Sequence, residues 1–146
     1  MNGRTATLGE LVEALNDGVT YFDIAAERSH RAACIELFQQ IRRLKLSIAA
    51  ELSAGALAEP AATGADGGWL EAYRRSCAGL TDQLARDTEP AIIAALEAQE
   101  QRIARAFRDA IGREREPQVR ELAATYLPEV ELARDHLHAL HRAMAH

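Results

Sequence analysis

The sequence is poor in the residues that define several protein classes. Its two cysteines, Cys34 and Cys77, are too few for a disulfide scaffold, so we expect reduced thiols and a cytoplasmic setting. No apolar run approaches the roughly 20 residues that a membrane span needs. The start of the chain, Met1 to Thr5, leads into charged residues without the apolar segment of a secretory signal.

Positive charge is also scarce. The chain carries 17 Lys and Arg against 22 Asp and Glu, a formal net charge of −5. A nucleic-acid partner is therefore not expected, since phosphate recognition needs a basic face, and a membrane surface is disfavoured for the same reason. Arg102, Arg105 and Arg108 do form a basic stripe, but it lies opposite an apolar helix face. We interpret it as a solvated surface.

Motifs of common enzymes are missing. The sequence has no glycine-rich phosphate loop, no Gly-x-Ser-x-Gly elbow and no Cys-x-x-Cys. Strand-type runs of Val, Ile and Thr are absent too, whereas Ala and Leu dominate, which indicates an all-α protein. With 146 residues, 48% of them hydrophobic, the chain is long enough for one domain, residues 1–146, with one core.

Apolar residues recur every three to four positions along most of the chain, which predicts helices. Thr7 and Glu10 have the spacing of a capping box, and Ser29 or His30 is expected to open the next helix. Gly112 suits the residue after a helix. The predicted helices cover residues 8–28, 30–52, 68–80, 89–111 and 117–144.

Four of these helices are long, and the connection after the second, residues 53–68, is long as well. The chain must travel back along the helices before the next long one begins. A mid-chain crossover of this kind predicts a ferritin-like four-helix bundle with one short extra helix, because short turns throughout would give a simple up-and-down order.

One carboxylate occupies an unexpected position. Glu100 falls within the apolar stripe of its helix and Glu97 lies at the edge of that stripe. A buried charge needs a partner. Glu100 is therefore either a metal ligand that projects into the bundle, or the partner of a cation such as Lys45 or Arg134.

The metal reading would place iron or manganese on Glu100, Glu97 and Glu27, with Asp23 or Glu129 as further candidates. Carboxylate di-iron bundles also use Glu-x-x-His on two helices, and no Glu in this chain is followed by His at that spacing. The leading hypothesis is therefore a bundle without a catalytic site or cofactor that acts through protein contacts. A metal-binding bundle with weak oxidase or iron-handling activity is the alternative.

Two surface features remain. His138 and His141 are one helical turn apart, which suits either a zinc- or nickel-type surface site or imidazoles that interact with a helix C-terminus. Tyr21 and Ile24 point away from the main stripe of the first helix. This second apolar face predicts either a cover by the short Trp69 helix or, preferred here, a homo-oligomer.

Several short segments support a family resemblance over about residues 8–144. These are Leu15-Asn16-Asp17-Gly18, Ala25-Ala26-Glu27, Ala49-Ala50-Glu51-Leu52, Gly68-Trp69, and Ala91-Ile92 followed by Glu97 and Glu100. With them the chain resembles a bacterial ferritin-like four-helix-bundle family known as a domain of unknown function. The resemblance implies the fold, a cytoplasmic setting and a loose link to stress or iron biology. Val19 and Thr20 stand where such members have acids, and Arg134 where they tend to have His.

Overall fold

The structure is a computed structural model that describes residues 5–57, 68–113 and 116–144. All regular structure in these residues is α-helical, as predicted. The helices are α1 (Leu8–Arg28), α2 (Ala32–Ala56), α3 (Trp69–Ser76), α4 (Leu80–Arg86), α5 (Glu89–Arg113) and α6 (Pro117–Met144). No helix in the described ranges is long and apolar enough to cross a membrane.

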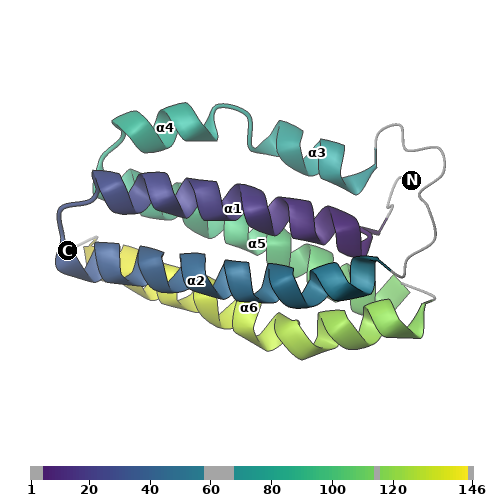
Figure 1. Cartoon of the computed structure of the whole chain (residues 1–146). Coiled ribbons are helices and arrows are strands. Elements are labelled where there is room, and N and C mark those ends of the chain that lie inside the picture. Colours follow the sequence, from purple (N-terminus) through teal and green to yellow (C-terminus); the bar gives the residue numbers. More distant parts are fainter. Residues whose placement is uncertain (1–4, 58–67, 114–115, 145–146) are drawn as a thin grey trace.

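The four long helices form two closely packed pairs, α1 with α2 and α5 with α6 (Figure 1). α3 and α4 lie along the outer side of α1 and lead the chain back to the end of the molecule where α2 begins (Figure 1). As a result α5 starts at the same end as α2. This return path is the one predicted from the long connection, and it is compatible with a ferritin-like bundle. Residues 58–67 of the connection lie outside the described part of the chain.

The capping box at the start of α1 is confirmed. Thr7 Oγ1 accepts from the Glu10 amide, and Glu10 Oε1 accepts from the Thr7 amide, each at 3.0 Å. The predicted start of the next helix is wrong by a few residues, because Ser29 is the C-cap of α1 and donates its hydroxyl to Ala25 O at 2.8 Å. α2 begins after Arg31, without a side-chain cap of its own.

Glu89, at the start of α5, contacts the two residues that lead into α2. Its Oε2 accepts from the backbone amides of His30 and Arg31, the latter at 3.1 Å. Burial alone would raise the pKa of Glu89, but these amides and the Arg31 guanidinium lower it overall. The two helix pairs are therefore tied together at this end of the molecule.

The predicted short helix at 68–80 is two helices. α3 ends at Ser76, and Gly79, with φ +81°, turns the chain into α4, which extends six residues beyond the predicted end. A left-handed residue cannot continue a helix, and glycine adopts that conformation without steric cost. The expectation for Gly112 is also wrong, since it lies inside α5 with a negative φ.

The core runs between the long helices and is built from their apolar faces. Its largest fully buried side chains include Phe22 of α1, Phe38 of α2 and Phe107 of α5. The rings of Phe22 and Phe38 meet edge to face at 5.9 Å. Among the described residues, four polar or charged ones are buried: Ser29, Lys45, Gln99 and Glu100.

Candidate functional site

An ion pair between two long helices lies in the interior. Lys45 Nζ of α2 is 2.5 Å from Glu100 Oε2 of α5, and the two side chains are 3% and 2% exposed. The interpretation that Lys45 neutralises Glu100 is confirmed. Arg134, the other cation considered, pairs with its neighbour Asp135 at 3.0 Å instead.

Gly18 of α1 makes room for the Lys45 side chain. A Cβ atom at position 18 would lie 2.8 Å from Lys45 Cδ and 2.9 Å from Cε. The absence of a side chain therefore lets the lysine stem cross α1 at contact distance on its way to Glu100. The ammonium also lies 5.6 Å from the centroid of the Phe22 ring, within the range of a cation–π interaction. This explains a glycine that interrupts an otherwise helical pattern.

The polar cluster continues from Glu100 toward α3. Gln99 is fully buried, and its Nε2 donates to the hydroxyl of Tyr73. Gln99 Oε1 has no hydrogen-bond partner among the described residues, and Glu100 Oε2 meets the Lys45 ammonium without the geometry of an ordinary hydrogen bond. Buried polar atoms left in this state lower stability. The cluster thus links α2, α5 and α3 at an energetic cost.

Two tyrosines that interact with Cys77 have perturbed acidity. Burial raises the pKa of the Tyr73 phenol far above its usual range, and the neighbouring Cys77 and Glu100 raise it further. Burial likewise raises the pKa of Tyr21 to about 12, with smaller contributions from Cys77 and Asp17. Both hydroxyls therefore stay protonated at neutral pH, as hydrogen-bonding groups rather than as bases.

A second cluster joins α5 and α6. Glu97 Oε2 is 2.7 Å from His138 Nδ1, and Glu97 Oε1 is 3.3 Å from His141 Nδ1. The two histidines lie on one face of α6 at the predicted spacing of one turn, but their contact with Glu97 was not predicted. Sequence spacing reports neighbours within one helix only, and the facing residue comes from another.

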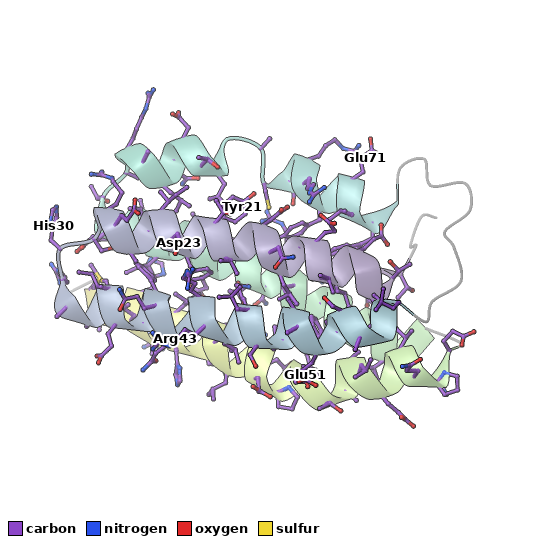
Figure 2. All side chains as sticks on the ribbon, in the orientation of Figure 1. Tyr21, Asp23, His30, Arg43, Glu51 and Glu71 are labelled. Atoms are coloured by element: carbon purple, nitrogen blue, oxygen red, sulfur yellow. The ribbon has the colours of Figure 1, made fainter. Side chains whose placement is uncertain are left out.

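The remaining candidate acids lie elsewhere. Glu27 and Asp23 line a polar surface groove between α1 and α2, where Asp23 pairs with Arg42. Figure 2 shows Asp23 and Arg43 on this side of the two helices. Glu129 is exposed on α6.

The structure therefore places Glu100 against Lys45, Glu97 against His138 and His141, and Glu27 in the surface groove between α1 and α2. Within residues 5–57, 68–113 and 116–144, no three His, Cys, Asp or Glu side chains are arranged to hold a metal ion. The residues around Glu100 do not fit a resident metal, because the Lys45 ammonium already contacts its carboxylate.

The outer face of α1 is covered from within the chain. α3 and α4 pack on this face, and Figure 2 shows Tyr21 on the side of α1 that faces them. Tyr21 and Ile24 are partly buried against the core. Both cysteines are free and buried, and burial raises the pKa of the Cys34 thiol.

These observations define an all-α protein whose apolar core contains a buried lysine–glutamate ion pair. The model of one family, described as "Domain of unknown function (DUF2383)", matches residues 4–113, about three quarters of the chain. The chain belongs to this family. The match includes both members of the buried ion pair and ends before α6. No curated protein and no solved structure matches the chain.

Proposed function

We propose that the chain is a non-catalytic, ferritin-like helical bundle that acts through protein–protein contacts, the first of them with a second copy of itself. The return of the chain along α1 supports the ferritin-like part of this proposal. The contact is supported by Leu132 of α6, which leaves 54% of its surface in solvent beside an apolar groove.

The groove runs between α2 and α6 and has a volume of about 180 Å³. Its apolar lining comes from Leu37, Ile41 and Leu44 of α2 and from Leu132 and Ala133 of α6. These two helices pack less extensively on each other than α1 packs on α2 or α5 on α6. A projecting leucine next to an apolar hollow is self-complementary, since one face supplies both halves of a two-fold contact.

The polar residues of the same face fit a second copy in one orientation. Glu129 and His136 also line the groove, and they flank Leu132 and Ala133 symmetrically along α6. If two α6 helices cross antiparallel about an axis between Leu132 and Ala133, Glu129 of each copy lies opposite His136 of the other. The contact would then have an apolar centre with one complementary polar pair on each side of it. We therefore place the proposed self-association on the α2–α6 face, in preference to the covered face around Tyr21 and Ile24.

The non-catalytic part of the proposal is supported by the pairing of the buried ionisable groups. Lys45 and Glu100 contact each other, and Tyr73 is held protonated beside them. The metal-binding alternative would need Glu100, Glu97 and Glu27 to converge, and no such group of three ligands occurs among the described residues. Iron or manganese at one or two equivalents in untagged, dialysed protein would contradict the proposal.

Analytical ultracentrifugation from about 1 µM to about 500 µM tests the contact, because a contact centred on one exposed leucine is expected to be weak. The wild-type chain should shift from monomer toward dimer with rising concentration. Leu132→Glu should remain monomeric, since it places a charge at the centre of the apolar contact. Leu46→Glu is the matched control, because Leu46 is another exposed leucine, at 41%, and does not line the groove.

A charge exchange gives a sharper test. Glu129→Lys should weaken the dimer, and adding His136→Glu should restore it, since the exchanged pair places a lysine of one copy opposite a glutamate of the other. A strictly monomeric wild-type chain, or equal loss of the dimer with Leu46→Glu and Leu132→Glu, would refute the proposed contact.

A further inference from the structure

A groove on the opposite side of the molecule combines aromatic and basic side chains. It lies between α3 and α5 and has a volume of about 470 Å³, within the size range of small-molecule sites. Trp69 and Tyr73 of α3 line one side, with their rings stacked at 5.0 Å and 14°. Arg102 and Arg105 of α5 line the other. Groups from two helices thus face a common space.

The aromatic side of this groove is held in place by polar contacts. Arg74 Nε of α3 donates to Asp17 Oδ2 of α1 at 2.8 Å, and the same guanidinium donates to Glu13 at 3.0 Å. The backbone amide of Leu70 donates to Glu10 Oε2 at 3.0 Å. These contacts hold α3 against α1, and the face of α3 that carries Trp69 lines the groove toward α5. The groove is therefore preformed, which lowers the entropic cost of binding.

Tyr73 is also held by a hydrogen bond from α5. Its hydroxyl accepts from Gln99 Nε2, which is buried in α5. This bond spans the same two helices as the groove and sets the position of the phenol ring on which Trp69 stacks.

Arg102 and Arg105 bring positive charge to this groove. Neither Arg102 nor Arg105 forms an ion pair with a residue that the structure describes, whereas Arg108, one turn further along α5, pairs with Glu131 at 2.8 Å. The lining contains a single acid, Asp109, so it carries a net positive charge in a chain whose total charge is −5. A guanidinium binds carboxylate or phosphate through paired N–H groups.

We propose that this groove binds a small planar aromatic anion, with its ring against Trp69 and its acidic group on Arg102 and Arg105. The apolar part of the lining, which includes Ala72, Ala98 and Ala106 on the two helices, accommodates the ring. This site is separate from the α2–α6 face and does not depend on self-association. All three arginines of the basic stripe are exposed, as predicted, and the proposal assigns a ligand to two of them.

The single tryptophan of the chain provides a direct readout, since its indole N–H gives one resonance in a nitrogen–proton correlation spectrum. The probes are 1-naphthaleneacetate and its neutral isostere 1-naphthaleneacetamide. The acid should shift the Trp69 indole resonance saturably, with a Kd on the order of 1 mM for a compound of this size. The amide should bind at least about tenfold more weakly, because it lacks the charge that the arginines recognise.

Two variants separate the charge from the shape of the site. Arg102→Gln with Arg105→Gln should weaken binding of the acid about tenfold or more and leave the amide unchanged. Ala98→Phe, at an exposed lining position, should block both probes by filling the groove. Arg108→Gln removes the same charge from the same helix outside the lining and should bind like wild type. Equal affinity for acid and amide, no saturable shift, or equal weakening by Arg108→Gln would overturn the proposal.

Discussion

Removal of Lys45 is the most informative perturbation of the interior. In Lys45→Met an unbranched side chain, one atom shorter than lysine, still passes Gly18, but Glu100 loses the only cation in contact with it among the described residues. Because Glu100 is 2% exposed, water cannot replace the ammonium without opening the helices. Breaking a buried pair from one side costs about 3–5 kcal/mol. That is a large fraction of the roughly 5–15 kcal/mol that stabilises a typical domain.

The partner variant Glu100→Met leaves the ammonium unpaired and should cost a similar amount. The double variant should differ sharply from the sum of the two. Replacing a whole buried pair by apolar side chains is often neutral or stabilising by about 1–4 kcal/mol, since neither charge then has to be desolvated. The double variant is therefore expected to be more stable than either single variant and close to wild type.

Urea unfolding followed by circular dichroism measures these differences. With a slope of about 2 kcal/mol per M, each single variant should lower the unfolding midpoint by about 2 M. The reasoning would be refuted if Lys45→Met cost less than about 1 kcal/mol, or if the costs of the two single variants added in the double variant. Either result would mean that the two charges reach water in the folded protein.

Two further predictions concern single side chains. Gly18→Ala should destabilise the protein in the same urea assay because the new Cβ would displace Lys45, although alanine favours a helix over glycine by about 1 kcal/mol. Gly112→Ala is the control: a Cβ there meets nothing within 4 Å, so the variant should be more stable than wild type by up to about 1 kcal/mol. The pKa of Tyr21 is about 12 in the folded chain against an ordinary value of 10.0, so folding favours the protonated phenol. The stability that Tyr21 contributes is therefore complete below pH 10 and is lost between about pH 10 and pH 12. Tyr21→Phe should reduce that alkaline loss, and absorbance at the phenolate band should show one fewer tyrosine titrating in the window; an unchanged alkaline profile would show that Tyr21 is solvated.

Local sequence signals predicted most of the helices. The capping box at Thr7 and Glu10, the proline at position 117 and the apolar periodicity placed α1 and α6 at their observed bounds. These signals act within a few residues of the chain, so they need no knowledge of the fold. Errors fell where a distant residue or a special backbone angle contributes: Glu89 holds the amides of the two residues before α2, and Gly79 separates α3 from α4.

For the candidate sites too, the sequence predicted what depends on one helix and missed what depends on the contact between two helices. Helical phase alone indicated that Glu100 faces the interior and that Lys45 is a suitable partner, since both lie near the apolar stripes of their own helices. The phase of one helix carries no information about which residue of another helix lies opposite. The contact of Glu97 with His138 and His141 and the bond from Gln99 to Tyr73 therefore appeared only in the structure.

By itself, the sequence determined that the chain forms amphipathic helices around one apolar core and that Glu100 faces that core, because these properties follow from short-range periodicity. Only the tertiary structure decided that α3 and α4 cover the outer face of α1 and that Arg102 and Arg105 share a groove with Trp69. Those contacts join residues far apart in the sequence. Their positions depend on how whole helices pack, which no local pattern specifies.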